Sequence, residues 1–112
     1  MSIKLTLLKS GETIISEMKE LVAEKEEQAH AYLLENPHIV KTREKSFLTE
    51  DEKKTGDFGI DVTLIPWIIL SADKKVIIPV DVVTTIVEPI LSVKQIFIDK
   101  IEAFNIKEEE ND

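Results

Sequence analysis

The sequence predicts a mainly β domain that ends in one α-helix, and three patterns support this. Apolar and polar residues alternate from Ile3 to Lys9, as in a half-buried strand. β-branched residues dominate Val76 to Val87, which favours extended backbone. The period then changes, and apolar residues follow at spacings of 3, 4, 4 and 3 from Ile90 to Phe104. A chain of 112 residues fits one domain with a single modest core.

The segment after the first strand carries two conflicting patterns. Residues 10–12 predict a turn, in which Gly11 can take a positive φ. The next segment, TIISEMKELVAEKEE, has apolar residues at i, i+1, i+4, i+7 and i+8, and its Glu and Lys content also favours a helix. Alternation is present too, but it is noisier. On its own pattern, this segment is predicted to be a helix.

The middle of the chain predicts one interrupted strand and one long connection. Residues 29–40 read as a strand, or as two short ones, because Asn36-Pro37 interrupts them and proline cannot donate to a central ladder. Lys41 to Asp61 is charged and contains Gly56 and Gly59. This composition predicts a solvated loop, with an irregular hairpin extension as the alternative.

The last third predicts three strands and the helix. Val62 to Leu70 is a strand in which Pro66 indicates an edge or a bulge. Ser71 to Lys75 is a turn. The remaining predictions are strands over Val76–Val80 and Val82–Val87, a helix over 92–105 with a capping box formed by Ser92 and Gln95, and a frayed acidic tail over 107–112.

The composition of the chain argues against several classes of function. The net charge of −8, from 14 basic and 22 acidic residues, opposes the neutralisation of phosphates on which nucleic-acid binding depends. The absence of cysteine excludes disulfides and thiolate metal sites and is compatible with a reducing cytoplasm. No apolar run approaches the roughly 18 residues of a membrane span, and the N-terminus lacks the long apolar stretch of a signal peptide. We therefore expect a cytoplasmic protein with no membrane partner.

The sequence offers no constellation for catalysis, a cofactor or a metal. His30 and His38 are not spaced as a ligand pair, and each is expected to be structural or exposed. The three glycines do not form a phosphate loop, and no nucleophile elbow occurs. Trp67 lies in the apolar run LIPWIIL, which predicts a place in the core or in a subunit interface. We expect a protein that is not an enzyme.

The order strand, glycine turn, strand, strand, variable loop, strand, strand is that of a small, strongly bent five-stranded antiparallel barrel. Near its end the chain reads VIIPVDVVTTI, which resembles the second motif of Sm and Sm-like proteins at its apolar positions and at Asp81. The family's Arg-Gly pair is replaced by Pro79 and Val80. LLKSGE, the PW element and VVTTIVEP make residues 3–89 similar to small Sm-like proteins of marine cyanophages.

This resemblance implies a fold and an assembly. It makes residues 13–23 the second strand, since tertiary context can override weak helix propensity. It also implies a homo-oligomeric ring of five to seven subunits, in which one subunit's edge strand pairs with the next subunit's. The expected paired edges are Val62 to Leu70 and Val82 to Val87. The residues expected in the subunit interface are Trp67, Ile69, Val82, Thr84 and Ile86.

Two functions follow from the resemblance. The first is a non-catalytic ring-forming scaffold or adaptor of phage origin, in the cytoplasm of the infected host, with a protein partner yet to be identified. The second is RNA binding, which the net charge disfavours. RNA-contacting or pore-facing positions would be Pro79 and Asp81, or, if the functional turn is instead Ser71 to Lys75, Lys74 and Lys75.

Overall fold

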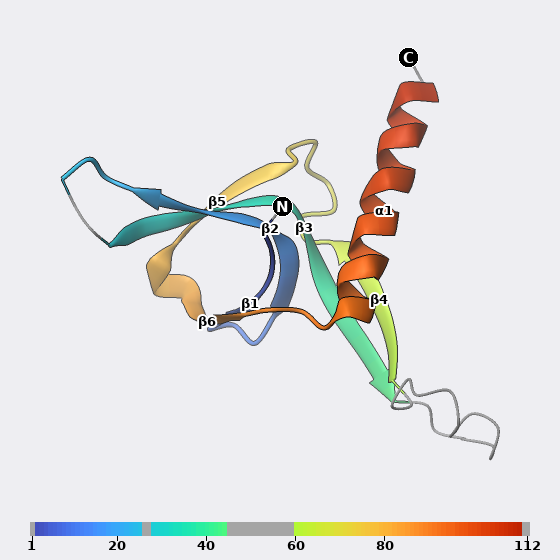
Figure 1. The fold of residues 1–112 in the computed structure, drawn as a ribbon, viewed down its shortest axis with the longest axis horizontal. Helices are drawn as coiled ribbons and strands as arrows, with labels where there is room; N and C mark the ends of the chain where they lie inside the picture. Colours follow the sequence, from blue (N-terminus) through green and yellow to red (C-terminus); the bar gives the residue numbers. More distant parts are fainter. Residues whose placement is uncertain (1, 26–27, 45–59, 111–112) are drawn as a thin grey trace.

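The structure, a computed structural model, describes residues 2–25, 28–44 and 60–110 (Figure 1). Within these ranges six strands form one antiparallel sheet, followed by a C-terminal helix. This confirms the predicted mainly β class. The elements are β1 (Ile3–Leu8), β2 (Thr13–Val22), β3 (Ala29–Glu44), β4 (Ile60–Pro66), β5 (Lys75–Pro79), the 3₁₀ turn η2 (Val80–Val82), β6 (Val83–Val87) and α1 (Leu91–Glu110).

The sheet is strongly bent but is not closed, and it has six strands where five were expected. Its order is β4-β3-β2-β1-β6, and β5 also pairs with β3. The predicted loop from Lys41 to Asp61 is shortened on both sides, because β3 continues to Glu44 and pairs with β4 as far as Ile60. This pairing extends the β3–β4 hairpin into the predicted loop, in agreement with the hairpin alternative. Residues 45–59 of the predicted loop lie outside the described residues.

One irregularity divides β3 between two partners. Ile15 of β2 is opposite His38 and Glu17 is opposite Glu35, so two residues of β3 face one of β2. These two residues are Asn36, with a φ of 54°, and Pro37. Such a bulge bends the strand. The part of β3 before it pairs with β5 and the part after it pairs with β4, so the predicted interruption is a bulge in one strand.

Residues 13–22 form strand β2, as the family resemblance implied and against the helical spacing of their apolar side chains. The reason is that both faces of β2 are covered. Ile14 packs in one core cluster and its neighbour Ile15 packs in the other, and each is fully buried. Adjacent buried residues on opposite faces of a strand imitate the i, i+1 part of a helical pattern.

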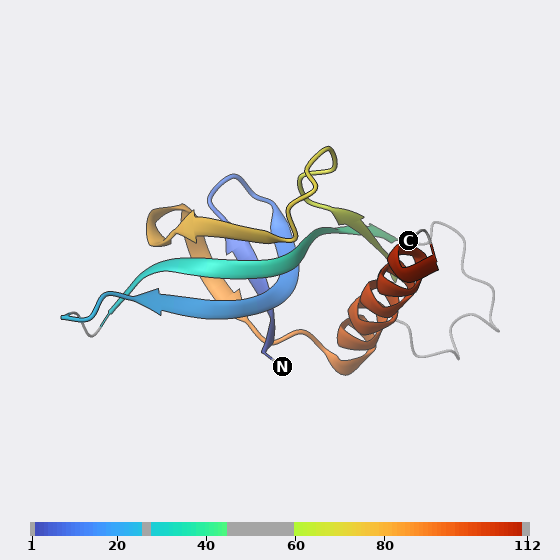
Figure 2. The ribbon, with the colours of Figure 1, turned by 90° about the horizontal axis from the view of Figure 1, so that it is seen from above.

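The two core clusters lie on opposite faces of the sheet. The inner cluster is enclosed by the bent sheet and consists of Leu8, Ile14, Met18, Leu34 and Ile78. The outer cluster is covered by α1, which stands against one end of the sheet (Figure 2). Phe97, at 1% exposure, is the side chain through which α1 enters this second cluster.

Three predicted boundaries differ in the last third. The strand predicted over Val62–Leu70 ends at Pro66, because the backbone turns there and Ser71 donates to the carbonyl of Ile68 at 3.0 Å. Val82 belongs to η2 and not to the following strand. The capping box is wrong: α1 begins at Leu91, which places Ser92 inside the helix, and Gln95 donates to Asp99 at 2.8 Å.

The helix is also longer than predicted, and its backbone reaches Glu110 instead of ending near Asn105. It therefore takes in most of the expected acidic tail. None of the helical segments in the described ranges has the length and apolar character needed to cross a membrane.

Candidate functional site

Three strands of the sheet have one side without a ladder partner among the described residues: β4, which corresponds to the expected edge Val62 to Leu70, β5 and β6. The main candidate site is formed by two of these open edges, those of β5 and β6. β5 pairs with β3 on one side and β6 pairs with β1 on one side. The other sides of β5 and β6 have no ladder partner among the described residues. An unpaired edge presents backbone N–H and C=O groups to another strand, so each edge can accept one.

The turn η2 connects these two edges and fixes the direction of each. Asp81 lies in η2, where the N–H of Val83 bonds to the carbonyl of Val80. The N–H of Lys9 bonds to the carbonyl of Val82 at 2.9 Å, which ties the turn to the end of β1. The two open edges therefore follow each other directly along the chain, joined by a three-residue turn that is hydrogen-bonded to the end of β1.

Apolar side chains are exposed along both edges. Ile77 of β5 is 63% exposed and Val87 of β6 is 50% exposed. Their neighbours Ile78 and Ile86 point the other way, into the inner core cluster. A strand edge with apolar residues on its outer face is a site for protein association.

The residues predicted for the subunit interface fall into two groups. Thr84, exposed at a register shift between β1 and β6, lies on β6, whereas Val82, at 37% exposure, lies in η2, where its carbonyl accepts from Lys9. Ile69 is 68% exposed, but it lies in the loop after β4 and not on a strand. Trp67 and Ile86 are half-buried and pack against the inner core cluster of their own chain. They therefore contribute to the core of the subunit.

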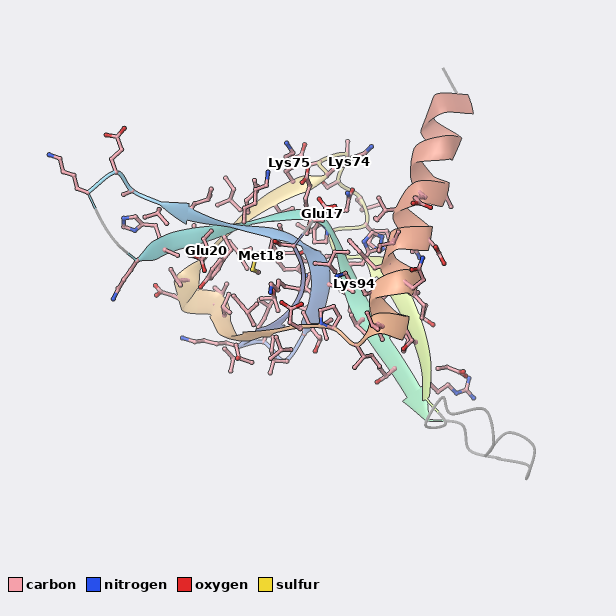
Figure 3. All side chains as sticks on the ribbon, in the orientation of Figure 1. Glu17, Met18, Glu20, Lys74, Lys75 and Lys94 are labelled. Carbon is pink, nitrogen blue, oxygen red and sulfur yellow. The ribbon has the colours of Figure 1, made fainter. Side chains whose placement is uncertain are left out.

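The residues predicted for RNA contact are not brought together. Lys74 and Lys75 lie at the start of β5, and Pro79 lies at its end (Figure 3). Four steps of strand separate Lys75 from Pro79 by roughly 13 Å, at about 3.3 Å per residue. Asp81 lies beyond Pro79 and adds negative charge there. The two lysines and the Pro79–Asp81 turn are thus separate surfaces.

Charged pairs flank the open edges. The Nζ of Lys75 lies 3.7 Å from Glu35 on the adjacent strand, and Lys4 contacts Glu88 just beyond β6. The side chains of Lys75 and Glu88 remain 65% and 67% exposed. Opposite charges therefore stand at the start of one edge and at the end of the other, available to a partner.

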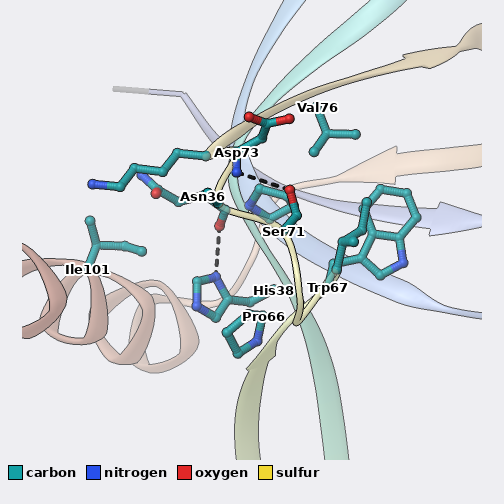
Figure 4. A pocket seen from close by; sticks show the side chains of 12 residues that line it. Asn36, His38, Pro66, Trp67, Ser71, Asp73, Val76 and Ile101 are labelled. Carbon is teal, nitrogen blue, oxygen red and sulfur yellow. Dashed lines mark hydrogen bonds between the residues drawn. The ribbon is translucent and has the colours of Figure 1, made fainter.

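A small cavity of about 200 Å³ lies where the β3 bulge meets the loop before β5 and the helix (Figure 4). His38 lines it, and its Nδ1–H donates to the carbonyl of Asn36 at 2.8 Å. The ring also packs edge-on against Phe97, with the ring centroids 5.9 Å apart. Burial lowers the pKa of His38, and the positive charge of Lys100 lowers it further. These contacts give His38 a structural role between sheet and helix.

A second cavity of about 370 Å³ opens beside η2, and Trp67 separates it from the first. The indole Nε1–H donates to Glu12 at 3.3 Å, which fixes the ring between the β1–β2 turn and the β3 bulge. Among the described residues, no group of three or more histidine, aspartate or glutamate side chains is placed to hold a metal ion.

The sequence analysis missed an exposed apolar loop. It assigned Ile68 and Leu70 to a strand, but both lie in the loop after β4, and Leu70 is 96% exposed. Ile90 and Leu91, at the junction of β6 and α1, are 61% and 83% exposed. The signal in the sequence was Pro66, which could have been read as the end of the strand.

Comparison of the chain with models of known protein families and with curated proteins finds no match.

Proposed function

We propose that this chain is a non-catalytic self-assembling scaffold or adaptor, in which β5 of one copy pairs with β6 of the next. The observation that carries the proposal is the presence of two open edges on one chain, each with an exposed apolar side chain, Ile77 on β5 and Val87 on β6. A copy that offers both edges can bind two neighbours at once. The contact is head-to-tail, so its repetition gives either a closed ring or an open filament.

The side-chain directions of the two strands select one register. β5 and β6 are joined antiparallel when Ile77 is opposite Val87, so that the two exposed apolar residues meet on the outer face. Ile78 is then opposite Ile86, and both of these already point inward. Pro79, which cannot donate a backbone hydrogen bond, falls at the end of the ladder, where proline is tolerated.

The resemblance to Sm-like proteins supports a ring of five to seven copies over a filament. It also supports an origin in a phage and action in the cytoplasm of the infected host. RNA binding is the less favoured function, because the net charge is −8 and Asp81 adds a negative charge to the turn where the family carries its Arg-Gly pair. The assembled ring would instead present the helix to a protein partner.

Cysteine cross-linking tests the paired edges directly, because the native chain contains no cysteine. The double variant Ile77→Cys/Val87→Cys is oxidised and run on a denaturing gel without reductant. Opposed residues of paired strands lie within disulfide reach, so we expect a ladder of covalent dimers and larger species. Reduction should collapse this ladder to a single band.

The matched control is Ile77→Cys/Lys19→Cys, which keeps one edge cysteine and moves the other to an exposed position on β2, a strand paired on both sides. It should give at most dimers from chance collisions. A native chain that sediments as a monomer at high concentration, with no ladder from the first variant, would exclude the assembly. Binding of a U-rich or A-rich oligonucleotide at low salt by the native chain would favour RNA instead.

A further inference from the structure

Two exposed apolar surfaces lie outside the strand edges themselves. The first, here named the loop patch, consists of Ile68, Ile69 and Leu70, which are 49%, 68% and 96% exposed. The second, named the linker patch, consists of Ile90 and Leu91, which are 61% and 83% exposed. Contiguous apolar side chains at this level of exposure mark interaction surfaces.

Each patch lies next to one of the two open edges, β5 or β6, along the chain. The loop patch lies shortly before β5, and the linker patch follows directly after β6. Figure 1 shows β5 beginning, and β6 ending, toward the side of the sheet where the helix stands. Within one chain, the two patches therefore sit at the same end of the sheet but at different edges.

Antiparallel pairing between copies brings the loop patch of one copy toward the linker patch of another. With Ile77 opposite Val87, continuation of the register places Lys75 opposite Pro89 and Lys74 opposite Ile90 of the neighbour. The loop patch precedes Lys74 by four to six residues and includes the turn in which Ser71 bonds to Ile68, so it lies beyond this end of the ladder, where the neighbour's Leu91 follows Ile90. We propose, resting on the edge pairing above, that the loop patch of each copy packs on the linker patch of the next.

The size of the edges gives an independent reason for a second contact. β5 and β6 each have five residues. A stable protein interface buries about 1,200–2,000 Å² in total, which is more than two such short strands supply. The apolar patches at the end of the ladder provide the additional buried surface that a lasting assembly requires.

Two charge-introducing variants, Leu70→Glu and Leu91→Glu, test the contact. Both side chains are at least 83% exposed, so neither change disturbs the core. We expect each variant to dissociate at concentrations at least about tenfold higher than the native chain, measured by analytical ultracentrifugation, since each buries a charge against leucine. Val22→Glu, which alters a 49% exposed residue at the far end of β2, should leave the assembly unchanged.

Mixing the two variants distinguishes a head-to-tail contact from a symmetric one. Leu91→Glu copies retain an intact loop patch and Leu70→Glu copies retain an intact linker patch, so the mixture should form 1:1 dimers that neither variant forms alone at the same concentration. If both variants assemble like the native chain while Ile77→Cys/Val87→Cys still cross-links, the patch contact is refuted and the edge pairing stands. If the cross-links are also missing, the proposed assembly itself fails. Leu70-dependent binding to phosphatidylcholine vesicles with unchanged assembly would also overturn the proposal.

Discussion

Glu17 of β2 and Glu35 of β3 lie directly opposite each other in the sheet, and both are only half exposed. Like charges in this position repel each other. Burial raises the pKa of Glu17 above its usual value of 4.5, and hydrogen bonding to Glu35 and the charge of Glu35 raise it further. Lys75, 3.7 Å from Glu35 on the next strand, places a positive charge at the other side of the pair.

Because the pKa of Glu17 is raised, its contribution to the free energy of unfolding decreases as pH rises. The folded state binds the Glu17 proton more tightly than the unfolded state does, so this contribution is present below pH 4.5 and is lost as pH rises through the raised folded pKa. We therefore expect Glu17→Gln to be more stable than the native chain at pH 7, with the difference disappearing in acid. Urea unfolding at both pH values measures it. Glu20→Gln, on an exposed position of the same strand, is the control, and a Glu17→Gln variant destabilised at pH 7 would contradict the prediction.

His38 is expected to act in the opposite direction. Its pKa lies below 6.5 in the folded state, first because of burial and second because of Lys100, so the unfolded chain takes up the proton more readily. Stability from neutral His38 is thus present above pH 6.5 and is lost as pH falls toward the lowered folded pKa.

Replacement by glutamine isolates this contribution, because the amide can still donate to the carbonyl of Asn36 but cannot ionise. The loss of unfolding free energy between pH 7.5 and pH 5.5 should be smaller in His38→Gln than in the native chain. His30→Gln, at an exposed position early in β3, should behave like the native chain. Equal pH dependence in all three proteins would show that His38 does not carry the effect.

Phe97 is expected to hold the helix on the sheet. It is 1% exposed and packs with Ile3, Ile15 and Leu64 in the outer cluster. Phe97→Ala should lower the free energy of unfolding by about 3–5 kcal/mol, as removal of a buried aromatic ring usually does. Ile96→Ala, one residue away and 40% exposed, should cost less than about half of that. Denaturant unfolding followed by circular dichroism compares the two, and similar losses would argue against docking through Phe97.

Two buried hydroxyls are expected to cost stability. Thr6 Oγ1 and Ser16 Oγ are fully buried and have no hydrogen-bond partner among the described residues. A buried hydroxyl without a partner costs about 1–3 kcal/mol. Thr6→Val keeps the shape and removes the hydroxyl, so it should raise the unfolding free energy by about 1 kcal/mol, whereas Thr63→Val on an exposed face of β4 should change it little. A destabilised Thr6→Val would reveal a partner for the hydroxyl.

Much of the fold could be predicted because it depends on local patterns. The alternation from Ile3 to Lys9 identifies β1, and the change of period after Val87 identifies the helix. Apolar periodicity reports which face of an element is buried, and that information is contained in neighbouring residues. The candidate interface was predicted in part for the same reason, since Val82 and Thr84 belong to the β-branched run.

The remaining features depend on which strands pair, and pairing brings together residues that are far apart in the sequence. The strand β2 forms despite its helical spacing because β1 and β3 pair with its two edges and the two core clusters cover its two faces. The bulge at Asn36-Pro37 decides that β3 is shared by β4 and β5. Lys74 and Asp81 are separated because the extended strand β5 lies between them.

By itself, the sequence determined that this protein is mainly β with a C-terminal helix, because hydrophobic patterning is local. Only the tertiary structure decided that the sheet stays open, with Ile77 and Val87 on two of its free edges and Leu70 and Leu91 beyond them. An edge exists only when no other strand of the chain covers it, and that is a property of the whole fold.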